Sequence, residues 1–197
     1  MLIIYAHPTK NGHCGYVLKT VLEVVKQKNI KYQILDLYQM NFDPVLKPDE
    51  HYTSGNRNVT PGNKKIQELI AAEQNFIFIY PTWWNNLPAI LKGFLDRIFT
   101  PGFAYKYEND RPLSLLKGRA IVFTATGAPW LYAKLLTKDR SIKVLTFDTL
   151  KFCGIKAKGF YINNANKLNE EKKKKIRKIA LKGIKILTKE NDKIFTF

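Results

Sequence analysis

Cysteine is scarce in this chain of 197 residues, which contains only Cys14 and Cys153. Two cysteines cannot form a disulfide scaffold, nor a zinc site with four cysteine ligands. No apolar run approaches the roughly 18 residues that a membrane-spanning helix needs. The chain begins directly with a strand-like run and has no basic segment of the secretory type. We therefore expect no membrane span and a reducing, cytoplasmic location.

Acidic residues are also few: 16 Asp and Glu stand against 33 Lys and Arg, giving a formal net charge of +17. Such an excess is typical of nucleic-acid-binding proteins. The densest basic run, 172–178, belongs to a helical pattern whose apolar side includes Ile176, Ile179, Ala180 and Ile184. A helix packed through that side leaves its lysines in solvent. We therefore expect no nucleic-acid partner, although a basic surface can attract acidic partners or phosphorylated cofactors.

The hydrophobic share of 45% and the charged share of 25% are those of a globular protein, and the length suits a single domain spanning 1–197. Along it, short apolar runs alternate with helical patterns. The runs predict strands at 2–6, 32–37, 75–80, 120–124 and 156–162. The helical patterns predict helices at 16–28, from Thr60 onward, at 88–99, at 141–152 and over the basic C-terminal segment.

Nearly continuous apolar strands that alternate with helices indicate an α/β fold, with a parallel sheet buried between helical layers. Right-handed crossovers make such a sheet open and doubly wound. Ligands then bind beyond the carboxyl ends of the strands. The loops that follow the first, third and fourth predicted strands are therefore the candidate binding segments.

The first of these loops, 7–16, has two glycines and two histidines and leads directly into a helix. A helix N-terminus with free N–H groups suits a phosphate, and His7 or His13 can add an imidazole donor. The loop matches neither the dinucleotide fingerprint nor the P-loop pattern. A tight turn with a capping histidine explains it equally well. For Cys14, a packed or backbone-bonded thiol is favoured over a nucleophile.

The other two loops carry aromatic and small residues. In 80–88, Trp83 and Trp84 are adjacent, so in an extended segment one indole faces the sheet and the other faces the crevice, where a flat aromatic ligand fits. Both tryptophans could instead fill the core or an interface. In 124–132, small residues and Gly127 allow a ring to approach the backbone closely, although an ordinary turn also explains this stretch.

Six segments within 5–154 carry a family resemblance. They are Tyr5-Ala6-His7-Pro8, Phe42-Asp43-Pro44-Val45-Leu46, the run from Pro81 to Gly93, Gly102-Phe103-Ala104-Tyr105-Lys106-Tyr107, Thr124 to Pro129, and Leu150-Lys151-Phe152-Cys153-Gly154. Through them the chain resembles the short members of the NAD(P)H:quinone oxidoreductase (DT-diaphorase-like) family of flavodoxin-like flavoproteins. The resemblance implies a flavodoxin-like fold: a doubly wound five-stranded parallel sheet, order 2-1-3-4-5, with helices on both faces.

The resemblance further implies a flavin, FMN or FAD, held by the three loops, with NAD(P)H as co-substrate. The cofactor-binding residues that it implies are His7, Asn11, His13, Cys14, Tyr16, Pro81, Thr82, Trp83, Trp84, Asn85, Thr126, Gly127 and Ala128. The first loop would bind the phosphate, and Thr82 to Asn85 would line the ring. Thr126, Gly127 and Ala128 would donate hydrogen bonds to its polar edge. The family often has a serine near Gly12, so Asn11 or His13 would replace that contact.

The implied activity is hydride transfer from NAD(P)H to the flavin, then two-electron reduction of a quinone or similar electrophile in the same slot, with ping-pong kinetics. The implied catalytic residues are Tyr105, Tyr107 and Tyr132. The first two match a Tyr-x-Tyr motif that reaches in from the second subunit of a homodimer with active sites at the interface. Tyr132 is offset by one residue from the family's tyrosine, and 137–139 lacks the histidine with which it pairs.

Two other functions stay open for this fold. One is an accessory subunit that regulates a potassium-efflux transporter, since such subunits resemble the same family. The other is a flavodoxin-type electron carrier, which the basic charge and the His7-Pro8 pair disfavour. No metal site is expected. The sequence does not choose between FMN and FAD or between NADH and NADPH, and the basic, Asn-rich stretch 52–65 is compatible with either flavin.

Overall fold

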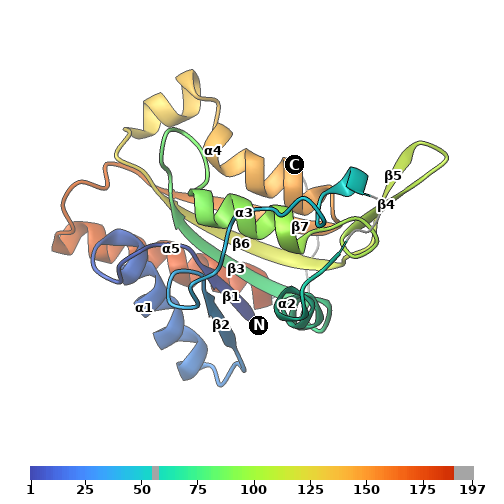
Figure 1. Cartoon of the computed structure of the whole chain (residues 1–197). Helices are drawn as coiled ribbons and strands as arrows, with labels where there is room; N and C mark the ends of the chain where they lie inside the picture. The colour runs from blue at the N-terminus through green and yellow to red at the C-terminus, as the bar shows by residue number, and fades with distance from the viewer. Residues whose placement is uncertain (55–57, 189–197) are drawn as a thin grey trace.

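The computed structural model describes residues 1–54 and 58–188 and is built around a five-stranded parallel sheet (Figure 1). Its strands are β1 (Leu2–Tyr5), β2 (Gln33–Asp36), β3 (Asn75–Pro81), β6 (Gly118–Ala125) and β7 (Ile155–Ile162). Their order is β2-β1-β3-β6-β7, and each neighbouring pair is parallel. The predicted flavodoxin-like sheet is therefore confirmed, together with its strand order. Residues 55–57 of the Asn-rich stretch and 189–197 of the predicted domain lie outside the described residues.

Helices cover both faces of the sheet (Figure 1). They are α1 (His13–Gln27), α2 (Pro61–Ala71), α3 (Ala89–Ile98), α4 (Arg140–Lys143) and α5 (Glu170–Thr188), with shorter helical turns η1 (Tyr52–Ser54), η2 (Tyr132–Leu136) and η3 (Val144–Lys151). Side chains alternate along each strand, so Ile3 and Ile77 pack under α1 and α5, while Ile4 and Phe78 pack under α2 and α3. No helix within residues 1–54 and 58–188 is long and apolar enough to cross a membrane.

Two helices form for the reasons that the sequence suggested. Thr60 caps α2 by accepting a hydrogen bond from the Asn63 N–H (3.3 Å), and Pro61 occupies the first helical position. In α5, Ile176, Ala180 and Ile184 are buried against the sheet, whereas most of its lysines are exposed. The basic run is therefore the solvent face of a packed helix.

The structure differs from the prediction in two segments. The predicted helix 141–152 is a short α4 followed by the wider π-helical turns of η3. An antiparallel hairpin, β4 (Tyr105–Glu108) with β5 (Arg111–Ser114), was not predicted. Its two-residue turn, Asn109-Asp110, has positive φ at both positions (51° and 60°), which matches the twist of a hairpin. The strands are short and mostly exposed, so they give little hydrophobic signal.

A buried ion pair attaches the long segment after β2 to helix α3. The Arg97 guanidinium donates two hydrogen bonds to the Glu50 carboxylate, at 2.6 and 2.8 Å, and a third to the Asp43 carbonyl at 2.6 Å. Both charged side chains are almost completely buried. Gly93, one turn earlier in α3, lies directly against the Pro44 backbone, where a Cβ would collide. The resemblance segments 42–46 and 81–93 therefore contact each other.

We predict that Arg97→Met lowers the free energy of unfolding by about 3 kcal/mol, because it leaves the Glu50 carboxylate buried and unpaired. The control is Lys92→Met, the same change on the same helix, which removes an exposed pair with Asp96 and should cost less than about 0.5 kcal/mol. Urea unfolding followed by circular dichroism measures both. Equal losses in the two variants would contradict the role given to the buried pair.

Candidate functional site

The three candidate loops meet at one edge of the sheet. After β1, β3 and β6, the N–H of the following residue donates to a carbonyl of the neighbouring strand. The three bonds are Ala6 to Ile79 (2.9 Å), Thr82 to Ala125 (2.8 Å) and Thr126 to Ile162 (3.0 Å). Hydrogen bonding between the strands therefore continues into the start of each loop. The expectation that these loops share an edge is confirmed.

The first loop is held close to the start of α1. Gly12 has φ +89°, and Gly15 lies against the Lys10 carbonyl, where a Cβ would collide. The Thr9 carbonyl accepts a hydrogen bond from the Tyr5 hydroxyl (2.8 Å) and contacts the His7 ring. The N-cap residue of α1 is Gly12, which has no side chain with which to cap the helix. Its first-turn N–H groups are therefore available to an anion at the N-terminus of the helix.

His13 and Cys14, the first two residues of α1, are both buried. Burial lowers the pKa of His13, and the positive charge of Lys172 adds to that effect. Its Nε2 atom has no hydrogen-bond partner among the described residues, so a buried polar atom beside the first loop is unsatisfied. The Cys14 side chain is only 3% exposed, as the packed interpretation expects, and burial raises the pKa of its thiol to about 12, which disfavours a nucleophile. Only the backbone of Cys14 can then contact a ligand.

The second loop is a tight turn and not an extended segment. Trp83 and Asn86 exchange hydrogen bonds (3.2 and 2.9 Å), while Trp84 and Asn85 have φ of 51° and 54°. The Trp83 side chain is 42% exposed and that of Trp84 fully exposed (101%). The expectation that one indole faces the sheet is therefore wrong, because the turn directs both indoles outward. The alternative that both tryptophans fill the core is wrong for the same reason. Pro81, another predicted residue of this loop, is buried at the end of β3.

The third loop has fewer free donors than expected. The Thr126 N–H donates to the Ile162 carbonyl, and the Ala128 N–H donates to the Thr126 hydroxyl (3.2 Å). Among the described residues, the N–H of Gly127 has no such partner, and Gly127 is exposed. Of the three expected backbone donors, only the Gly127 N–H is therefore free for a ligand.

A cavity of about 390 Å³ lies between the second and third loops. Six predicted residues line it: Thr82, Trp84, Asn85, Thr126, Ala128 and Tyr132. Four further lining residues were not predicted: Ala133, Thr137, Ser141 and Tyr161. Tyr161 is the last residue but one of β7, the weakest predicted strand, and its position at the carboxyl end of that strand was the signal that could have identified it.

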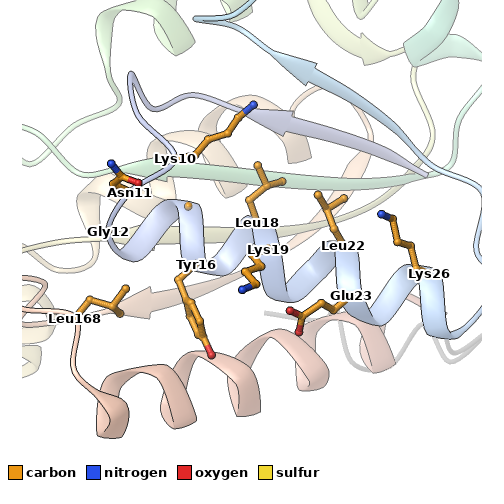
Figure 2. A pocket seen from close by; sticks show the side chains of 11 residues that line it. Lys10, Asn11, Gly12, Tyr16, Leu18, Lys19, Leu22, Glu23, Lys26 and Leu168 are labelled. Carbon is orange, nitrogen blue, oxygen red and sulfur yellow. The ribbon is translucent and has the colours of Figure 1, made fainter.

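A second cavity, of about 570 Å³, runs along the outer side of α1. Figure 2 shows Lys10 and Asn11 at its end near the helix N-terminus and Leu18 and Leu22 further along the helix. The Tyr16 side chain points towards α5 (Figure 2), where Lys173 Nζ lies 5.9 Å from its ring centre. The structure therefore places Asn11 beside the first loop but directs the Tyr16 ring away from it.

Tyr105 and Tyr107 do not join Tyr132 at the 390 Å³ cavity. They lie on β4, in the hairpin that projects from the opposite end of the molecule to the loops after β1 and β3 (Figure 1). The centres of the Tyr105 and Phe152 rings are 5.0 Å apart, and both residues line a separate cavity of about 320 Å³. Within one chain, the three predicted catalytic tyrosines are therefore divided between two regions.

A family model described as flavodoxin-like fold matches residues 1–185, so the chain belongs to this family of flavodoxin-like proteins. It is 32% identical over 177 residues to an uncharacterized NAD(P)H oxidoreductase of Haemophilus influenzae, covering 88% of each chain. It is 27% identical to mouse ribosyldihydronicotinamide dehydrogenase [quinone], covering 89% of this chain and 86% of that one. The crystal structure of Smu.1420 from Streptococcus mutans superposes with a TM-score of 0.79 at 32% identity, covering 92% and 97% of the two chains. The names of the first two relatives agree with the predicted NAD(P)H oxidoreductase.

We predict that Gly15→Ala lowers the free energy of unfolding by about 1–3 kcal/mol, because its Cβ displaces the Lys10 backbone. Gly62 is the matched control, since it occupies the first turn of α2 with open space around it, and Gly62→Ala should be neutral or stabilise by about 0.5 kcal/mol. Thermal or urea unfolding measures both changes. Equal effects would show that the first loop is not held against α1.

Proposed function

We propose that this chain is a flavin-dependent NAD(P)H oxidoreductase that reduces quinones or similar electrophiles by two electrons. One observation carries the proposal: the fully exposed Trp84 forms a wall of the 390 Å³ cavity at the carboxyl edge of the sheet. Its backbone is in the left-handed conformation, which a bulky residue adopts only at an energetic cost. Such a side chain is suited to covering a planar ring. The names of the relatives support the same reaction class.

The residues at this edge fit a flavin, either FMN or FAD. The uncapped N-terminus of α1 and the first loop, including His7 and Asn11, offer donors for a phosphate. The unsatisfied Nε2 of buried His13 requires a partner, which a sugar-like chain beside the loop can supply. The cavity beyond it is lined by Trp84 and by Thr126 and Ala128, the two neighbours of Gly127. Together these groups match a phosphate, a hydroxylated chain and a planar ring.

The protein contributes positioning and electrostatics to the reaction. When bound, the flavin supplies reversible two-electron transfer. The first turn of α1 would hold the negative phosphate, Trp84 would orient the planar ring, and the Gly127 N–H would be available to its polar edge. NAD(P)H and the acceptor would use the same open side of the site in turn, and ping-pong kinetics would follow. The histidine that the resemblance implies is missing from 137–139, so the resemblance leaves that role near the ring without a residue in this chain.

A homodimer would bring the divided tyrosines together. Tyr107 is exposed on a hairpin that projects from the body (Figure 1). The family resemblance implies that Tyr105 and Tyr107 reach the active site of the partner. We propose that they line the quinone-binding side of that site.

The first test is to purify the protein, record its visible absorbance and identify the released flavin by chromatography. We expect a yellow protein that oxidises NAD(P)H when a quinone is present. Trp84→Ala should raise the Kd of the flavin roughly threefold to tenfold, because it removes the stacking surface. Trp130→Ala is the control, since Trp130 is also exposed but does not line the cavity. A colourless protein that takes up neither FMN nor FAD would refute the proposal.

Tyr107→Ala should raise the KM for the quinone about threefold or more and leave the flavin content unchanged, since the tyrosine contacts the acceptor and not the cofactor. Lys106→Ala is the matched control, because Lys106 is adjacent on β4 and its side chain points to the opposite face. Steady-state kinetics and flavin absorbance give the two readouts. Parallel loss of flavin and of quinone affinity would contradict the assigned role of Tyr107.

A further inference from the structure

Two hydroxyl groups from different elements meet in the wall of the 390 Å³ cavity. Ser141 Oγ and Tyr161 Oη are 2.9 Å apart, and both residues line the cavity. Ser141 belongs to the first turn of α4, and Tyr161 is the last residue but one of β7. The hydroxyl of the fully buried Tyr80 donates to the Ser141 carbonyl at 3.0 Å. The position of Ser141 is therefore fixed from the core of the sheet.

Counting protons shows where the free proton of this pair lies. One proton joins the two oxygens, and the other must find an acceptor elsewhere. Ser141 is only 1% exposed, and among the described residues its hydroxyl has no other partner than Tyr161. If Tyr161 were the donor, the Ser141 proton would be buried without an acceptor, at a cost of about 1–3 kcal/mol. Ser141 is therefore the donor, and the proton of Tyr161 is free to point into the cavity.

Tyr161 also stays protonated at neutral pH. Burial raises the pKa of its phenol, and the negative charge of Asp139 acts in the same direction. Hydrogen bonding with the Ser141 hydroxyl and with the Ile142 backbone opposes them, as expected when donors stabilise the phenolate. The net effect is a raised pKa. The phenol can therefore donate a hydrogen bond at neutral pH.

Each threonine hydroxyl that lines the cavity already takes part in one hydrogen bond within the protein, although only Thr137 is established as a donor. Thr137 donates to the Ala133 carbonyl at 3.0 Å, and the hydroxyls of Thr82 and Thr124 pair with each other at 2.8 Å. The Thr126 hydroxyl accepts from the backbone, as described above. Tyr161 thus combines a free proton with a side chain that the protein itself holds in place.

We infer that Tyr161 donates a hydrogen bond to the ring held in this cavity, with Ser141 as its positioning residue. The inference rests on the proposed flavin-dependent function and assigns to this chain a donor that its sequence resemblance did not provide. Tyr161 reaches from β7 the same cavity that Thr137 lines, in the segment 137–139 where the implied histidine is missing.

The test titrates flavin-free protein with FMN and with FAD and measures the two-electron midpoint potential of the complex. Tyr161→Phe keeps the ring but removes the donor, so the Kd should rise roughly threefold to tenfold. The two-electron midpoint potential should become more negative in this variant, because a hydrogen-bond donor stabilises the reduced ring, which carries more negative charge than the oxidised ring. Ser141→Ala should shift both values in the same direction by a smaller amount. Tyr32→Phe, outside the residues that line the cavity, should leave both unchanged.

Each result decides the inference. Wild-type Kd and potential in a folded Tyr161→Phe variant would overturn it while leaving the proposed function intact. If Tyr161→Phe does not fold, Ser141→Ala replaces it, and a wild-type potential in that variant overturns the inference. Wild-type protein that binds neither FMN nor FAD would refute the proposed function and the inference together. A negative shift of the potential in Tyr161→Phe and Ser141→Ala, but not in Tyr32→Phe, supports both roles.

Discussion

The hydrogen bond from the Thr82 N–H to the Ala125 carbonyl extends the pairing of β3 with β6 beyond the last paired residue of β3. The candidate site depends on this bond, because it sets the distance between the Trp83–Asn86 turn and the third loop. Similar bonds after β1 and β6 align the neighbouring loops. Parallel pairing alone thus brings together three segments that are distant in the sequence, and the side chains at their tips determine the chemistry.

The sheet, its order and the face of α5 could be predicted from the sequence, because each depends on apolar periodicity or on a resemblance carried by specific residues. The Thr60 cap was predictable from two adjacent residues. The direction of Trp84 was not, because it depends on two left-handed residues in a four-residue turn, and neither is glycine. The hairpin β4–β5 escaped prediction because its short strands are exposed and bury little apolar surface.

The candidate site was predictable where the family resemblance points to residues of one loop, as for Thr82, Trp84 and Asn85, which line the cavity. Sequence reasoning failed where function depends on contacts between elements. The pair of Ser141 and Tyr161 comes from residues twenty positions apart, on a helix and a strand, and neither belongs to a recognisable motif. Likewise, only the structure reveals that the N–H groups of Thr126 and Ala128 are already bonded within the protein.

The most direct test of the account is a crystal structure of the protein with its bound flavin. The account predicts the ring between Trp84 and Gly127 and the phosphate at the first turn of α1. A flavin bound instead in the cavity along α1 lined by Leu18 and Leu22, or beside Tyr105 and Phe152 of the same chain, would contradict it.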